Sequence, residues 1–150
     1  MRSAIPLLLF FSIACRTYPR AHSREELVQF YFTADDYDNF EWMEKLLTDD
    51  VRIKYLDLVV SKKFVLKRMR ESKGVHENIR NKGGRKAGYY DVYFRNYILG
   101  YTLHGDTAEC LVQGFAESVD GGMLMEEEKG QIRFQFRGDK ISAILIKNIK

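Results

Sequence analysis

Tyr55 and Asp57 have the residue types and the spacing for acid–base chemistry. We expect residues 51–60 to form a strand, in which alternate residues point to the same face, so that the phenol and the carboxyl lie side by side. A carboxyl held in this way can transfer a proton to or from a bound molecule. The alternative is that Tyr55 only packs and that Asp57 is solvated at the end of the strand, since most buried aromatic residues serve packing alone.

Other motifs that would indicate a reaction are missing from the sequence. His22, His76 and His104 are far apart, and no His-x-x-x-His or Cys-x-x-Cys spacing occurs, so we expect no metal site. No Gly-x-Ser-x-Gly motif is present, and Gly83-Gly84 lacks the Lys-Ser/Thr ending of a phosphate-binding loop. We therefore expect no cofactor.

Positive charge is concentrated in one segment of the chain. The 150 residues carry a net charge of only +3, but between Lys62 and Lys86 the cations far outnumber Glu71 and Glu77. Clustered cations attract polyanions, so this segment could bind an anionic polysaccharide or lipid surface. The alternative is an ordinary solvated helix face. The candidate polyanion-binding residues are Lys67, Arg70, Lys73, Arg85 and Lys86.

The N-terminus has the pattern of a secretory leader. Arg2 precedes an apolar run over residues 4–11, and Ser12 and Ala14 supply small residues before a cleavage site. We expect residues 1–14 to be a signal peptide, 15–22 a flexible N-terminus and 23–150 one domain of a secreted, extracellular protein in which nucleic acid is a disfavoured partner. Cys15 could instead carry a lipid, could pair with Cys110, or could be removed, leaving Cys110 as a lone buried thiol.

The elements that must position any site begin with helices. Ser23 with Glu26, and Asp38 with Glu41, have capping-box spacing and predict helices over residues 24–33 and 39–47. Ser61 should start a third helix that extends to about Ser72. Apolar residues recurring at helical spacing on each segment predict one buried face.

Long strands should make up the second half. Aromatic and branched residues predict strands over 89–104, 107–119, 131–137 and 141–149, with turns at Gly105-Asp106 and Gly138-Asp139. The last strand is apolar on both faces, so both faces should be covered; Ile144 and Ile146, if they point outward, would favour a homodimer. The expected class is α+β, in the order α-α-β-α-β-β-β-β.

Two N-terminal helices leading through LLTDDVRIKY, a third helix, and closing strands ending in IRFQFRGDKISAILI resemble the nuclear-transport-factor-2-like superfamily, which includes ketosteroid isomerases and SnoaL-like enzymes. The resemblance spans Ser23 to Ile149. It implies a strongly curved antiparallel sheet wrapped around the three helices as a cone, an apolar cavity at the open end, and frequent dimerisation through the outer face of the sheet.

The isomerase site carries over only in part. The resemblance places Tyr31 at the position of the tyrosine that donates a hydrogen bond to the oxyanion, but Tyr55 stands where the general-base aspartate belongs. The second oxyanion-hole aspartate falls near Ile132. Because the proton-transferring carboxyl is missing, steroid-type isomerisation is not expected.

We therefore predict a protein that binds a small apolar ligand in its cavity, or a protein partner on its sheet, without catalysis. The predicted ligand-binding residues are Tyr31, Trp42, Tyr55, Phe115 and Phe134. The alternatives are a SnoaL-like isomerase, cyclase or dehydratase that uses Tyr31, Tyr55 and Asp57 as catalytic residues, and an extracellular polyanion-binding protein.

Overall fold

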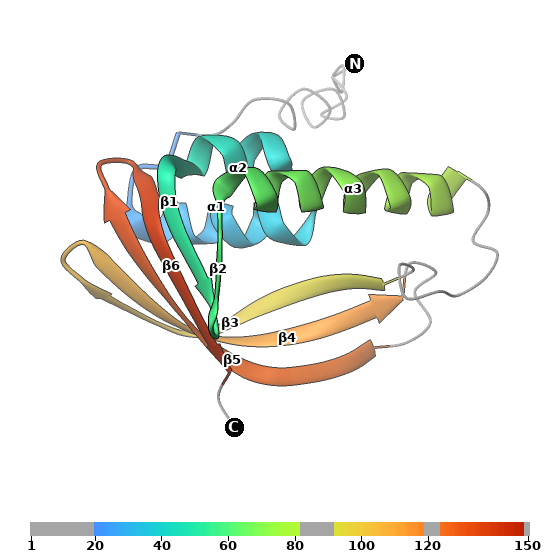
Figure 1. The fold of residues 1–150 in the computed structure, drawn as a ribbon. Coiled ribbons are helices and arrows are strands. Elements are labelled where there is room, and N and C mark those ends of the chain that lie inside the picture. Colours follow the sequence, from blue (N-terminus) through green and yellow to red (C-terminus); the bar gives the residue numbers. More distant parts are fainter. Residues whose placement is uncertain (1–19, 82–91, 119–123, 149–150) are drawn as a thin grey trace, which may run out of the picture.

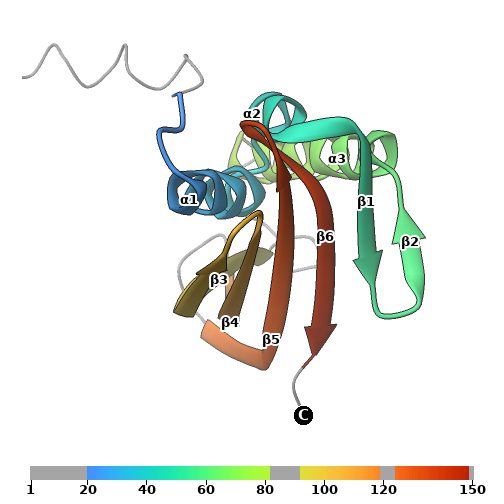
Figure 2. The same cartoon turned by 90° about the vertical axis from the view of Figure 1, so that its left-hand side faces the viewer.

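Three helices pack against the concave side of a six-stranded sheet (Figures 1 and 2). The computed structural model describes residues 20–81, 92–118 and 124–148. The predicted leader 1–14, Cys15, and the basic residues Arg85 and Lys86 lie outside these residues. The described elements are α1 (Arg24–Asp36), α2 (Phe40–Leu46), β1 (Leu47–Tyr55), β2 (Leu58–Val60), α3 (Lys62–Asn81), β3 (Val92–His104), β4 (Thr107–Ser118), β5 (Leu124–Arg137) and β6 (Lys140–Asn148).

The strands follow the order β2-β1-β6-β5-β4-β3 across the sheet. All neighbours are antiparallel except β1 and β6, which are parallel. Figure 2 shows the curvature, with α1 above the β3 side of the sheet and α3 above the β1 side. The predicted α+β class and cone-like curvature are therefore confirmed, with one parallel strand pair in a mixed, open sheet.

Side-chain caps begin all three helices. The Ser23 hydroxyl accepts a hydrogen bond from the Glu26 amide, and the Ser61 hydroxyl accepts one from Phe64, as the sequence predicted. The cap of α2 is Asn39 and not Asp38, because Asp38 has a φ of 51° and belongs to the tight turn that follows α1. The Asn39 side chain accepts from the Trp42 amide at 3.1 Å.

Several predicted element boundaries were wrong: α1 ends at Asp36 and not at residue 33, β1 begins at Leu47 and not at residue 51, and β5 begins at Leu124 and not at residue 131. Two further differences affect the candidate sites. The expected strand over residues 51–60 is a hairpin, in which Leu56 and Asp57 form the turn between β1 and β2. Asp57 therefore does not share a strand face with Tyr55. The third helix does not end near Ser72 but runs on to Asn81, passing through Gly74, whose cost of about 1 kcal/mol does not end it.

The two predicted glycine turns are present. Gly105, with a φ of 56°, joins β3 to β4, and Gly138, with a φ of 64°, joins β5 to β6. Both conformations are left-handed, which glycine adopts without steric cost.

The core lies between the helices and the inner face of the sheet. The residues on β5 alternate, with Ile132, Phe134 and Phe136 buried. Ile144 is only 1% exposed and Ile146 packs against the core, so neither supports dimerisation through the outer face of the sheet. The largest fully buried side chains are Phe134, Met43, Leu46, Leu47, Ile141, Ile144, Val28 and Cys110. None of the described helices is both long and apolar enough to span a membrane.

Candidate functional site

The structure brings together only two of the predicted ligand-binding residues. Tyr31 on α1 and Phe134 on β5 are buried, and their ring centroids are 5.1 Å apart. Trp42 packs edge-on against Phe30 at 6.0 Å, and Phe115 packs against Tyr97 at 5.0 Å. Ligand binding by these residues stays a prediction.

The predicted catalytic residues do not converge. Tyr55 is 44% exposed at the end of β1, and Asp57 lies in the turn beyond it. Tyr31, in contrast, is on the buried face of α1. The phenol of Tyr31 remains protonated because burial, and then the nearby charge of Asp35, raise its pKa. Tyr31 is therefore a hydrogen-bond donor without the carboxyl that the sequence interpretation gave it.

A different carboxyl lies one helical turn from Tyr31. Asp35 is four residues further along α1, so both side chains are on the same face of the helix. Asp35 is exposed at the surface, although protein atoms crowd round its carboxyl and displace part of its hydration. This desolvation, followed by the charges of Asp36 and Asp38, raises the pKa of Asp35 to about 7. The carboxyl can thus both give and accept a proton near neutral pH.

Asn96 on the edge strand β3 connects Asp35 to Asp36. Its side-chain amide donates to Asp35 Oδ2 at 3.3 Å and to Asp36 Oδ1 at 3.1 Å, and its backbone N–H donates to the same Asp36 oxygen at 3.0 Å. Burial raises the pKa of Asp36 as well, while the bonds from Asn96 lower it. The two carboxyls are therefore held at a fixed spacing, with Asn96 as their shared donor.

The dipole of α1 disfavours carboxylates at the end of the helix where Asp35 and Asp36 lie. The C-terminal end of a helix carries partial negative charge, yet the last turn of α1 has no basic residue and ends in Asp35 and Asp36. Asp38 follows directly and accepts a hydrogen bond from the Ser72 hydroxyl of α3 at 3.0 Å. Carboxyls gathered against a local preference, with raised pKa values, are typical of functional sites.

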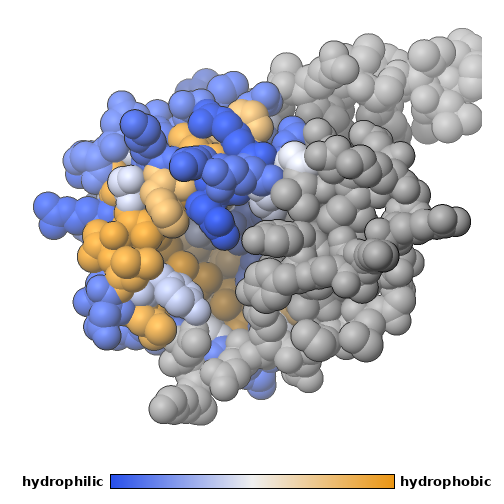
Figure 3. Space-filling view, turned by 45° about the vertical axis from the view of Figure 1, so that its right-hand side comes forward, coloured by the Kyte–Doolittle hydropathy of each residue, from blue (hydrophilic) through white to orange (hydrophobic). Residues whose placement is uncertain are grey.

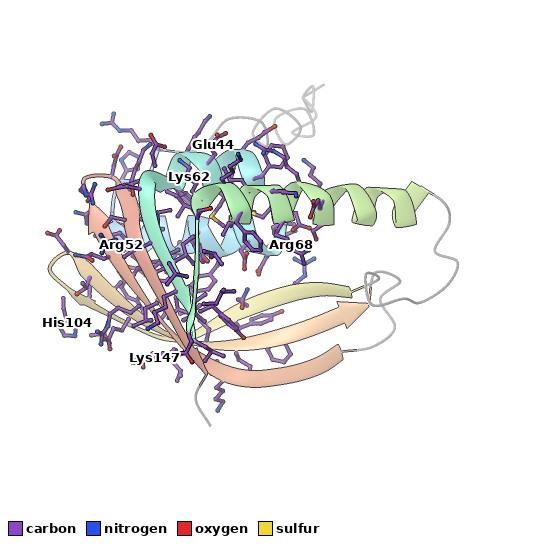
Figure 4. All side chains as sticks on the ribbon, in the orientation of Figure 1. Glu44, Arg52, Lys62, Arg68, His104 and Lys147 are labelled. Carbon is purple, nitrogen blue, oxygen red and sulfur yellow. The ribbon has the colours of Figure 1, made fainter. Side chains whose placement is uncertain are left out.

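The carboxyls lie at the C-terminal end of α1, against strand β3. Figure 1 shows the C-terminal end of α1 between α3 and strand β3. The space-filling view in Figure 3 shows a hollow in this side of the molecule, with a hydrophobic floor and hydrophilic residues above it. In Figure 4, Arg68 lies on the side of α3 that faces β3 and β4. Apolar walls with a few polar groups are the usual composition of a small-molecule site.

The predicted polyanion-binding residues have mixed environments. Lys67 pairs with Glu71 at 3.8 Å, while the cations of Arg70 and Lys73 lie over the Phe40 ring, 4.7 and 5.3 Å from its centroid. These contacts give the charged face of α3 a packing role beside α2. Polyanion binding stays a prediction. In the described part of the chain, no group of three His, Cys, Asp or Glu residues is placed to hold a metal ion.

The sequence interpretation missed Asp35, Asp36 and Asn96. The available signal was the pair of acidic residues at the end of a predicted helix, four positions after an inward-facing tyrosine. The contact to Asn96 joins residues 60 positions apart in the chain, so no local pattern could have indicated it.

Comparison with known proteins adds the class of fold. No family model matches the sequence, and no curated protein sequence matches it. Solved structures do match. An LEH-like epoxide hydrolase from M. tuberculosis has a TM-score of 0.62 at 12% identity, covering 83% of this chain and 80% of its own. An NTF2-like protein from Cytophaga hutchinsonii has a TM-score of 0.56 at 10% identity, covering 85% and 90%. A putative polyketide cyclase from Sinorhizobium meliloti has a TM-score of 0.53 at 15% identity, covering 81% and 94%.

These similarities establish the nuclear-transport-factor-2-like fold for this chain. The predicted resemblance is thus confirmed at the level of the fold. At such low identity the fold does not determine the activity, because this fold carries several chemistries.

Proposed function

We propose that this protein binds a small amphipathic molecule in the hollow between its helices and its curved sheet. The apolar part of the molecule would lie against the aromatic core, and its polar end would meet Asp35 and Asn96. The observation that carries this proposal is the set of hydrogen bonds by which Asn96 holds Asp35 and Asp36 together, one helical turn from Tyr31.

The protonation state of Asp35 would select the ligand. Below about pH 7 the neutral carboxyl can donate a hydrogen bond, and above it the carboxylate can only accept. A ligand with a hydroxyl or an amine would suit the carboxylate, whereas a carbonyl or ether oxygen would suit the acid. We expect affinity for a given ligand to change across this pH range.

Binding can be tested with Nile red, a neutral apolar dye. Wild-type protein should enhance the fluorescence of the dye, and Tyr31→Trp, which adds bulk at a buried position one helical turn from Asp35, should weaken this binding at least about tenfold. Asp57→Asn is the matched surface control and should bind as wild type does. Equal binding by the Tyr31→Trp variant, with its fold retained by circular dichroism, would contradict the proposed location.

A second candidate function, proton transfer by Asp35, is favoured by the same pKa. This is the SnoaL-like alternative, with Asp35 replacing Asp57 as the acid–base group and with Tyr31 available to stabilise a developing oxyanion. A panel of enolisable ketones can be screened for hydrogen–deuterium exchange at the carbon next to the carbonyl. Asp35→Asn should abolish any exchange that the protein catalyses, and exchange unaffected by this substitution would remove Asp35 from the mechanism.

We further propose that the protein is secreted after cleavage at the end of residues 1–14. The support is the pattern of the N-terminal sequence. Mass spectrometry of the protein recovered from its native source should find a chain that starts at Cys15. A chain that retains Met1 inside the cell would contradict secretion.

A further inference from the structure

The β1–β2 hairpin and the first turn of α3 expose a group of large apolar side chains. We call this group the hairpin patch; each of its residues is at least 44% exposed, and its members are Tyr55, Leu56, Leu58, Val59 and Phe64. Figure 3 shows exposed hydrophobic surface beside the hollow. Several large apolar side chains exposed on one short hairpin of a soluble domain mark an interaction site.

Both faces of the hairpin are apolar. Ile53 is buried, and Tyr55 lies two residues further along β1 with Leu58 as its partner, so these two side chains point to the inner face of the sheet. Val59 pairs with Lys54 on the opposite, outer face. A flat protein partner could cover only one of these faces, whereas a lipid interface can surround a projecting tip on both.

The backbone of the turn is strained at an apolar residue. Leu56 has a φ of 52°, in the left-handed region that glycine and asparagine occupy at lower cost. Its backbone N–H donates to the Ile146 carbonyl at 3.3 Å, which ties the turn to β6. Leu56 is half exposed, so this turn presents an apolar side chain at the tip of the hairpin.

Cations surround the hairpin patch. Lys54 lies on the outer face beside Val59, Lys63 precedes Phe64, and Lys147 follows Ile146 at the turn; all three are exposed. Figure 4 shows Lys147 at the same end of the sheet as the turn. Among the described residues, no carboxylate lies within ion-pair distance of these three, and Asp57 is the acidic residue of the turn. The patch is thus apolar in its centre and basic around it.

We propose that the hairpin patch docks this protein on an anionic lipid bilayer. The apolar tip would enter the interface between headgroups and acyl chains, while Lys54, Lys63 and Lys147 would contact the acidic headgroups. A second copy of this chain suits the patch less well, because symmetric pairing would bring the same cations together. This docking is independent of the proposed ligand site.

The experiment is co-sedimentation of the mature chain with vesicles of phosphatidylcholine and phosphatidylserine in a ratio of about seven to three. Wild-type protein should sediment with these vesicles, and the bound fraction should fall on addition of salt. The double variant Leu56→Asn/Leu58→Ser should lower the partition coefficient at least about tenfold, since the two apolar side chains that would enter the bilayer are lost. The variant should remain folded, because both side chains are exposed and asparagine suits the backbone of residue 56.

Matched controls distinguish vesicle binding through the hairpin patch from nonspecific adsorption. Leu103→Ser removes an exposed leucine on β3, 46% accessible, and should leave vesicle binding unchanged. Asp35→Asn should also leave it unchanged, whatever that substitution does to ligand binding. Lys54→Glu/Lys63→Glu should weaken binding to the anionic vesicles.

Three results would overturn the proposal. The first is a wild-type protein that stays in solution with phosphatidylserine vesicles. The second is a hairpin variant that binds as strongly as wild type. The third is a wild-type dimer in sedimentation equilibrium that the hairpin substitutions dissociate, without vesicle binding, which would assign the patch to a second copy of the chain.

Discussion

At the scale of single residues, the candidate site depends on Asp35. Its raised pKa means that the folded protein binds a proton more tightly at this carboxyl than the unfolded chain does. Below about pH 4 the group is protonated in both states and costs nothing. As the pH rises towards 7, the unfolded chain gains from ionisation while the folded chain does not, so folding stability falls.

Asp35→Asn should therefore stabilise the protein above neutral pH and have little effect in acid. We expect a gain of about 1–2 kcal/mol at about pH 8, smaller than the full shift implies because solvent screens a partly open carboxyl. Urea denaturation at about pH 8 and in acid measures the change in the free energy of unfolding. Asp57→Asn, in the exposed turn, is the control and should change stability at neither. A loss of stability for Asp35→Asn at high pH would mean that the carboxylate is favourably solvated.

Desolvation and neighbouring carboxylates raise the pKa of Asp35, and Asn96 on β3 opposes them. Its amide donates to the charged form and so lowers the pKa against the effect of burial. Asn96→Ala should raise the Asp35 pKa above its value of about 7, as followed by the side-chain carboxyl carbon shift in an NMR titration. Ser72→Ala, which removes a donor to Asp38 instead, is the comparison. An unchanged Asp35 titration in the Asn96 variant would show that the bridge does not form in solution.

At the scale of elements, helix starts were predictable because they are local. Ser23 and Ser61 each satisfy an amide three residues later, and this spacing is visible in the sequence. The error at Asp38 arose because Asp38 and Asn39 are both good caps, and only the turn after α1 selects between them. The Leu56–Asp57 turn was missed because leucine rarely adopts a positive φ.

The cap of α2 can be tested directly. Asn39→Ala should lower the free energy of unfolding by about 1 kcal/mol, because the Trp42 amide loses its acceptor. Asn39→Asp keeps an acceptor oxygen at the same position and should have a much smaller effect. Chemical denaturation of both variants gives the measurement, and equal stability of Asn39→Ala and wild type would show that water replaces the cap.

At the scale of the whole molecule, the fold was predictable and the site was not. Alternating apolar residues on β5 and periodic ones on α1 indicate which faces are buried. The curvature of the sheet around the helices was expected only from the resemblance to a known superfamily. The parallel contact of β1 with β6 and the bridge from Asn96 to α1 both join distant parts of the chain. Such contacts follow from how the elements pack, so they become visible only in three dimensions.

Cys110 offers a probe of how the whole molecule opens. Its side chain is fully buried on β4, and burial raises the pKa of the thiol to about 12. Only the thiolate reacts readily with a disulfide reagent, so modification of native protein should wait for unfolding. In a Cys15→Ser background at about pH 8, the rate with Ellman's reagent should rise with urea in parallel with the unfolded fraction.

An exposed thiol supplies the comparison for this experiment. Leu111→Cys, in the same Cys15→Ser background, places a thiol on the outer face of β4, where 36% of the native side chain is exposed, and it should react at once without urea. Phe134→Ala should destabilise the protein by about 3–5 kcal/mol and accelerate the modification of Cys110 accordingly, because Phe134 packs between α1 and the sheet. Rapid modification of Cys110 in native protein, with Phe134 intact, would mean that β4 separates from the helices locally, and that the hollow opens without global unfolding.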